Sequence, residues 1–191
     1  MKPKFEYFLN AVHYCIFLSQ LRLNAFFDKY VELPFARMLE FFMSEKGKRR
    51  FRLNQQRSKK ELDDFFCSKE AGFCIGLAHH LFGFFVTCYF VFIGFLLLGF
   101  LSKQFGVENV LGDGFVRMLI LAIPVTIGYI PVYKAVFSND VYLKFFNEFE
   151  KKDEKWHRKW KRITAAFVTL SIMMFLSGVF ITFIMLIPVF G

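Results

Sequence analysis

Histidine is the residue type with the widest range of chemistry in this sequence, and the chain has four. His79 and His80 lie in an apolar stretch, where an imidazole could carry a proton or ligate a metal ion. Neighbouring residues of an α-helix point about 100° apart, so these two cannot ligate one metal together. A bis-histidine haem needs a facing histidine on another apolar span, where there is none, and His13 and His157 add too few for a di-iron site. We therefore expect His79 to form an interhelical hydrogen bond.

No other pattern indicates catalysis. The four cysteines show no CxxC pair and no metal-ligand spacing, which predicts small buried hydrophobes outside any disulfide framework. The sequence contains no GxGxxG, GxxxxGK[ST] or HExxH motif, and its serines lack a matched His–Asp arrangement. The central parts of the apolar stretches hold none of the Asp, Glu, Lys or Arg residues that membrane enzymes and carriers use at depth. We expect a protein that is not an enzyme, with no catalytic residue, metal or cofactor.

Three long stretches with few charges organise the rest of the chain. Residues 71–102 contain no Lys, Arg, Asp or Glu, and about 20 helical residues suffice to cross a hydrocarbon core about 30 Å thick. A second stretch, 115–137, is kinked by Pro124 and Pro131, and a third, 163–190, is free of charge. The 30 Phe residues suit helices that turn apolar side chains towards lipid. The sequence therefore predicts an all-α integral membrane protein with three transmembrane helices.

The first 70 residues predict amphipathic helices at the membrane surface. Residues 5–27 are apolar except for one polar stripe, which predicts a helix at the interface or packed on the bundle. The stripe consists of Glu6, Asn10, His13, Gln20 and Asn24. A fourth transmembrane span is the alternative, although Arg22 ends the uncharged run. A secretory signal peptide is disfavoured, because no cleavage site follows this segment. After a break at Pro34, residues 34–43 predict a second short helix, and the capping box at 58–61 predicts the start of a third that continues into the first span.

Residues 45–60 carry most of the net charge of +9, with eight basic residues against one acidic residue. Each basic residue contributes about 1 kcal/mol near an anionic leaflet, so we expect a lipid anchor, with an acidic cytosolic partner as the alternative. Phe51 is the single aromatic residue there, too few for base stacking, so we expect no nucleic-acid binding. The predicted lipid-headgroup residues are Lys46, Lys48, Arg49, Arg50, Arg52, Arg57, Lys59, Lys60, Trp156 and Trp160.

Residues 138–162 predict a cytoplasmic amphipathic helix, capped by Asn139 or Asp140 and continuous with the third span. Its apolar stripe, at three- and four-residue spacing, consists of Tyr142, Phe145, Phe146, Phe149, Trp156 and Trp160. This stripe could pack either against the membrane surface or against the N-terminal helices. In the second arrangement residues 1–70 and 138–162 together form a cytoplasmic helical layer.

Small residues gather on one face of the first and third spans. Helices in lipid associate by close packing, which small side chains allow, so we expect these two faces to contact each other. The predicted helix-packing residues are Gly72, Gly76, His79, Gly83, Thr87 and Gly94 of the first span, and Thr164, Ser171, Gly178 and Thr182 of the third.

The basic residues also predict orientation, because cytoplasmic loops are rich in Lys and Arg. Residues 1–70 hold fourteen, 103–117 hold two and 134–162 hold nine. We expect a multi-pass protein of the inner (cytoplasmic) membrane, with the N-terminus cytoplasmic, residues 103–114 as an external loop and the C-terminus external. The Phe- and Lys-rich composition suggests a bacterial source.

Taken together, these features favour a non-catalytic membrane subunit or scaffold whose basic, aromatic helices bind anionic lipid headgroups and a protein partner. We expect the chain to form a homo-oligomer or to bind a membrane or cytosolic protein, and we identify no small-molecule substrate. The first alternative is a homo-oligomeric pore or membrane-perturbing effector, with Thr164, Ser171 and Thr182 lining the water path. An enzyme acting through His79 or His80 ranks third.

Overall fold

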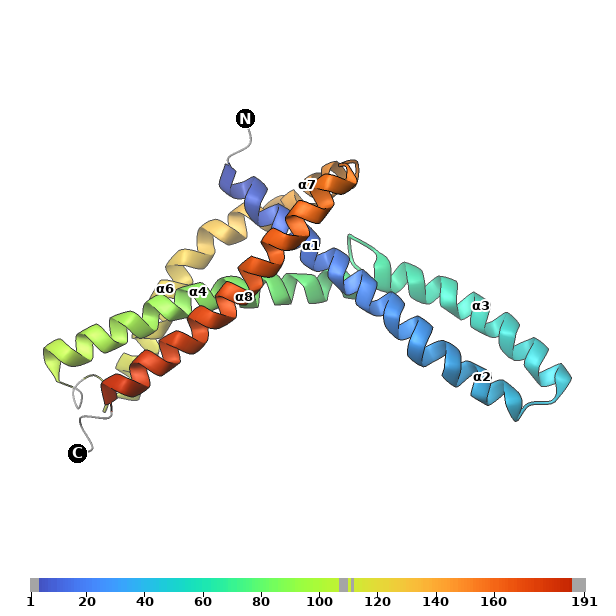
Figure 1. The fold of residues 1–191 in the computed structure, drawn as a ribbon, viewed down its shortest axis with the longest axis horizontal. Coiled ribbons are helices and arrows are strands. Elements are labelled where there is room, and N and C mark those ends of the chain that lie inside the picture. Colours follow the sequence, from blue (N-terminus) through green and yellow to red (C-terminus); the bar gives the residue numbers. More distant parts are fainter. Residues whose placement is uncertain (1–3, 107–109, 111, 187–191) are drawn as a thin grey trace. The chain divides into compact units, whose positions relative to one another are not determined.

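The computed structural model describes residues 4–106, 110 and 112–186, and the elements in this part of the chain are all helical (Figure 1). The chain divides into two compact units, His13–His80 and Met1–Val12 with Leu81–Gly191. Helices α1 and α4 each contribute to both. The elements are α1 (Lys4–Phe27), η1 (Asp28–Glu32), α2 (Leu33–Phe41), α3 (Glu45–Cys67), α4 (Phe73–Phe105), α6 (Gly114–Val136), η2 (Ser138–Asp140), α7 (Val141–Phe149) and α8 (Glu154–Leu186).

Within the described residues, three helical stretches are long and apolar enough to cross a membrane: Phe73–Phe105, Gly114–Phe149 and Glu154–Ile184. Of the most apolar part of each, 28%, 6% and 11% is buried within the protein. Most of the apolar side chains in these stretches therefore face outwards, as they do in helices that cross a membrane. The prediction of an all-helical chain with three helices able to span a membrane is confirmed.

In the unit His13–His80, α1 continues into α2 without the break predicted at Pro34. The connection is the π-helical segment η1, in which the N–H of Leu33 donates to the carbonyl of Asp28, five residues earlier. Proline has no N–H and its ring displaces the preceding turn, and a π-helical turn is a known way to absorb such a disturbance. The helix therefore widens before Pro34, and the prediction of a chain break is wrong.

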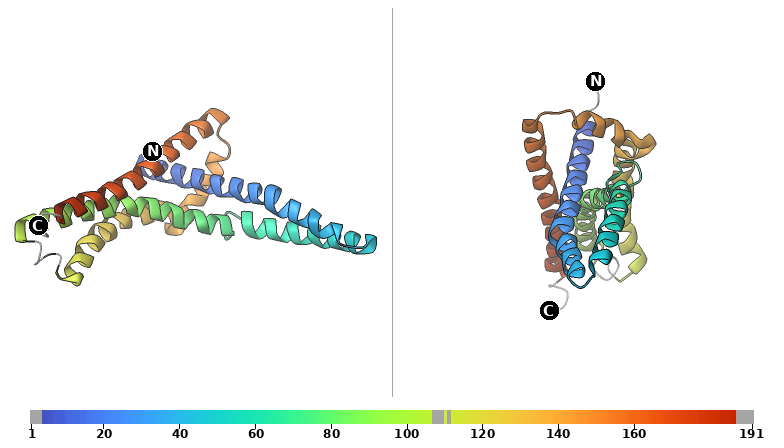
Figure 2. Two further views of the ribbon diagram at one scale, coloured as in Figure 1. Left: turned by 60° about the horizontal axis from the view of Figure 1, so that its bottom comes forward. Right: turned by 90° about the vertical axis from the view of Figure 1, so that its right-hand side faces the viewer.

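Helix α3 returns beside α2 to form a helical hairpin, which we call the α2–α3 hairpin (Figure 2). Ser44 caps α3 by accepting a hydrogen bond from the N–H of Gly47 at 3.3 Å. The predicted start at the capping box of residues 58–61 is wrong, because the helix already begins at Glu45. The predicted continuation into the first span is also wrong, because α3 ends at Cys67 and α4 begins at Phe73.

In the other unit, the chain kinks between α6 and α7 at two left-handed residues. Asn139 and Asp140 have φ of 54° and 52°, a conformation that asparagine and aspartate tolerate better than most residues. Asp140 is the N-cap residue of α7, as predicted, but its side chain makes no capping hydrogen bond. The single helix predicted for residues 138–162 is wrong, because α7 ends at Phe149 and α8 begins at Glu154. Asp153 starts α8 by accepting from the N–H of Trp156 at 3.1 Å.

The apolar stripe of α7 packs against the N-terminal end of α1, not outwards. Four of its residues are buried, with at most 4% exposed: Tyr142, Phe145, Phe146 and Phe149. The Tyr7 ring of α1 lies edge-on to Phe149 at 5.1 Å and to Trp160 at 5.8 Å, and its hydroxyl accepts a hydrogen bond from the Trp156 indole at 2.9 Å. Of the two supports that the sequence left open, α7 thus uses the N-terminal helix.

Candidate lipid-headgroup and helix-packing sites

Gly83 and Gly94 of α4 face α6 rather than α8. A Cβ at Gly83 would meet the Tyr129 hydroxyl at 3.1 Å, and one at Gly94 would meet Leu121 at the same distance. Conversely, Gly128 of α6 receives the ring of Phe90, which a Cβ there would overlap. Small residues on both helices thus allow close approach, as they do at helix contacts in lipid. The predicted pairing of the α4 and α8 small-residue faces is wrong.

The small-residue face of α8 packs instead on aromatic side chains of α4. A Cβ at Gly178 would lie 2.8 Å from the ring of Phe95 and 3.1 Å from that of Phe92. Thr164 and Ser171 are buried on the same face, and Thr182 is half-buried. The sequence missed this contact because it matched small residues with small residues, whereas a glycine is equally suited to receive a large ring.

The remaining predicted packing positions have separate surroundings. Gly72 is buried just before α4, and a Cβ there would collide with the carbonyl oxygen of Ser68. Gly76 has no other atom within 4 Å of such a Cβ, and Thr87 is half-buried. Gly72 is therefore required by the tight connection from α3 to α4, and Gly76 is not required by any contact with the described residues.

His79 pairs with His13 of α1, in the unit His13–His80. The Nδ1 atom of His79 lies 2.9 Å from the Nε2 atom of His13, and the rings are 4.8 Å apart. His13 is fully buried, and burial, followed by the nearby His79, holds the pKa of His13 well below its ordinary value of about 6.5. One neutral ring donates to the other, so the pair joins two helices by a polar bond. From the sequence, we predicted that His13 lies on a polar stripe and His79 on a packing face, but not that the two side chains contact each other.

Asn10, also on the predicted polar stripe, caps another helix. Its side-chain amide donates to the carbonyl of Ala135 at 2.9 Å and to that of Glu6 in its own helix at 2.9 Å. Ala135 lies in the last turn of α6, where carbonyls have no partner within the helix. A fully buried asparagine therefore satisfies an acceptor that lipid could not satisfy.

The metal-ligating residue types do not gather in the described part of the chain. Among these residues, no group of three or more His, Cys, Asp or Glu side chains is placed to hold a metal ion. His80 is exposed, and Cys67 is exposed whereas Cys15, Cys74 and Cys88 are buried. The prediction that all four cysteines are buried is therefore wrong for Cys67.

The eight basic residues among the predicted headgroup residues fall into three groups. Arg57, Lys59 and Lys60 lie in α3, but their side chains are outside the described residues. Lys48 and Arg52 form ion pairs: Lys48 with Glu45 at 2.6 Å, and Arg52 with both carboxylate oxygens of Glu40 at 2.8 and 2.9 Å. Hydrogen bonds from Arg52 hold the pKa of Glu40 below its ordinary value. The third group, Lys46, Arg49 and Arg50, is exposed and makes no ion pair with the described residues.

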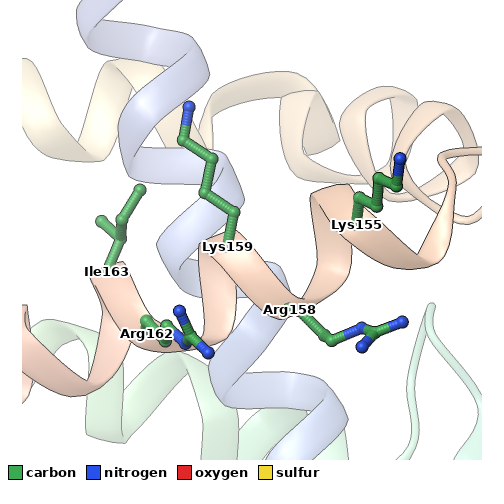
Figure 3. A pocket seen from close by; sticks show the side chains of 5 residues that line it. All are labelled: Lys155, Arg158, Lys159, Arg162 and Ile163. Carbon is green, nitrogen blue, oxygen red and sulfur yellow. The ribbon is translucent and has the colours of Figure 1, made fainter.

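A second basic surface, which we call the α8 basic pocket, was not predicted as a unit. Its residues follow at helical spacing in the first turns of α8, and Figure 3 shows their side chains projecting from those turns. They are Lys155, Arg158, Lys159, Arg162 and Ile163. Arg158 is paired with Glu154 at 3.0 Å, and the other three basic groups form no ion pair with residues that the structure describes. The signal was available in the sequence, since positions i, i+3, i+4 and i+7 share one helix face.

The aromatic residues next to this pocket are fixed by the protein. Trp156 and Trp160 are half-buried, and the Trp156 ring stacks on Phe149 at 4.8 Å. The basic groups therefore project from a helix whose neighbouring face is held by α1 and α7. Comparisons with protein-family models, with curated proteins and with solved structures give no match. The fold defines the class of protein: in the part of the chain that the structure describes, all elements are helical and three helices could cross a membrane, consistent with a multi-pass membrane protein.

Proposed function

We propose that this chain is a non-catalytic integral membrane scaffold, whose basic helix faces bind anionic lipid headgroups on the cytoplasmic side and hold a protein partner there. The observation that carries the lipid part is the α8 basic pocket. Lys155, Lys159 and Arg162 have no acidic partner among the described residues, and they lie immediately before the charge-free part of α8. Basic groups at that position lie at the headgroup level when the apolar part spans the bilayer.

The pocket chemistry suits a phosphate group. Arginine presents two parallel N–H donors to phosphate oxygens, and lysine adds a point charge. The aromatic contacts of Trp156 and Trp160 hold this part of α8 in place, which lowers the entropic cost of ordering the basic groups on a headgroup. We assign to the pocket one anionic lipid, bound through its phosphate.

The apolar stripe of α7 is covered by α1, so it is not available to bind a protein partner. The pore alternative gains no support from Ser171 and Thr182 of α8. Ser171 donates to the carbonyl of Val168 at 2.8 Å, and Thr182 to that of Gly178 at 2.9 Å. These hydroxyls are engaged within their own helix, so the scaffold remains our proposal.

The test is native mass spectrometry of the full chain, extracted from its host membrane with its lipids. We expect bound anionic phospholipid to be lost when Lys155, Lys159 and Arg162 are replaced by glutamine, and a second polypeptide in the complex mass. The control replaces the exposed Lys144, Lys151 and Lys152 by glutamine, which removes the same charge elsewhere. Equal lipid retention in both variants contradicts the lipid site, and a complex containing only this chain contradicts the scaffold.

A further inference from the structure

An exposed apolar stripe runs along the second half of α1, through η1 and along α2. Six residues that are three or four positions apart form it, and all six are exposed: Leu23, Phe27, Tyr30, Pro34, Met38 and Phe41. Eighteen helical residues extend about 27 Å. Phe41 is 82% exposed and Phe42, at the tip of the α2–α3 hairpin, is 79% exposed. A continuous apolar surface of this length on the outside of a protein indicates a binding surface.

The helix that follows the tip supplies positive charge. Lys46, Arg49 and Arg50 in the first turns of α3 are exposed and form no ion pair with the described residues. The segment 45–60 to which they belong carries a formal charge of +7. The hairpin therefore combines an apolar stripe on one helix with unpaired basic groups on the other, both starting from the same tip.

The positive charge of segment 45–60 distinguishes between two possible binding partners of the apolar stripe, a second copy of the chain and an anionic membrane. A second copy of the chain would bring two segments of +7 together within about a Debye length of 8–10 Å, where salt screens their repulsion incompletely. A membrane with anionic lipids supplies both an apolar interface and negative phosphates. It is also always within reach, because five residues separate the end of α3 at Cys67 from the start of α4, the first helix long and apolar enough to span a membrane, at Phe73. A tether this short makes contact with the bilayer an intramolecular event.

We propose that the α2–α3 hairpin lies along an anionic leaflet, with the stripe buried at the lipid interface and Lys46, Arg49 and Arg50 on lipid phosphates. This inference rests on the proposed function, which places the basic helices at that leaflet, and adds to it an apolar insertion surface. The aromatic tip then enters deepest, because Phe41 and Phe42 are the most exposed of the apolar side chains at this end.

The test uses the full chain in nanodiscs, either of phosphatidylcholine alone or of phosphatidylcholine with an equal part of phosphatidylglycerol. A nitroxide label is attached at Phe41→Cys in a Cys67→Ser background, because Cys67 is the exposed native thiol. The matched control is Lys29→Cys, an exposed polar position in the same helical rod. Power saturation compares the accessibility of each label to oxygen, which concentrates in lipid, with its accessibility to a water-soluble nickel chelate.

We expect a several-fold higher oxygen-to-nickel ratio at position 41 than at position 29 in the discs with phosphatidylglycerol. The ratio at 41 should fall when Lys46, Arg49 and Arg50 are replaced by glutamine, a change that keeps the Arg52–Glu40 pair of the hairpin. Equal ratios at the two positions overturn the inference, as does dipolar broadening that reveals a second copy on the stripe. The α8 lipid measurement is independent of these labels, so failure of one proposal is distinguishable from failure of the other.

Discussion

The contact between Phe90 and Gly128 offers the sharpest test of the packing between α4 and α6. Gly128 lies in the middle of α6, and its missing side chain leaves the space that the Phe90 ring fills. Replacing Gly128 by alanine places a methyl group into that ring. Gly76→Ala is the matched control, since a Cβ at Gly76 has no other atom within 4 Å.

Two opposing effects determine how much each alanine substitution changes the free energy of unfolding. Alanine in a helix interior is more favourable than glycine by about 1 kcal/mol, which benefits both variants. Forcing an extra methyl group into a filled space costs about 1–3 kcal/mol, and this cost falls on Gly128→Ala only. The two variants should therefore differ by about 1–3 kcal/mol, with Gly76→Ala at or above the wild type. For a chain of this size, about 2–4 °C per kcal/mol predicts a difference of about 2–12 °C in unfolding midpoint.

The assay is thermal unfolding in one detergent, followed by circular dichroism, on both variants, on Phe90→Ala alone and on the double variant Phe90→Ala with Gly128→Ala. Removing the ring also removes the clash, so the double variant should be more stable than the sum of the two single changes predicts. Equal midpoints for Gly76→Ala and Gly128→Ala, with no coupling to position 90, would refute the helix contact described above.

Two further predictions concern the polar residues of α1. Asn10→Leu should destabilise the protein by about 1–3 kcal/mol, because it removes the side-chain donor of the part-buried Ala135 carbonyl. Asn24→Leu, on the less buried end of the helix, should have little effect, and the unfolding midpoint checks both variants. His13 has a lowered pKa when folded, so the unfolded chain binds its proton more readily, and this part of the stability is complete above a pH of about 6.5 and is lost as the pH falls further. The midpoint should therefore fall from pH 7.5 to 5.5 by more in the wild type than in His13→Gln, and identical slopes would contradict the neutral buried pair.

The parts of the fold that follow from local pattern were predictable, and the parts that depend on partner choice were not. Length and absence of charge were enough to locate three helices able to span a membrane, because each condition is a property of a single segment. The break between Phe149 and Glu154 was missed because i,i+4 charge pairs support a continuous helix, and Asp153 is an equally suitable cap for a new one. Periodicity showed that Gly83 and Gly178 lie on packing faces, but it carries no information about which ring fills each space.

The sequence predicted the apolar stripes but not the surface that covers each of them. Lipid, a partner protein and another part of the same chain all favour the same apolar side chains, so periodicity alone cannot distinguish the stripe of α7 from that of α2. Polar atoms at the edge of each stripe do distinguish them. Beside α7, the Trp156 N–H finds the Tyr7 hydroxyl within the protein, so this stripe is an internal contact. In α3, beside α2, the exposed cations of Lys46, Arg49 and Arg50 form no ion pair with the described residues and are free to pair with an anion outside the protein. Phosphate in an anionic leaflet is the anion that we propose for them, because the same surface accepts apolar side chains.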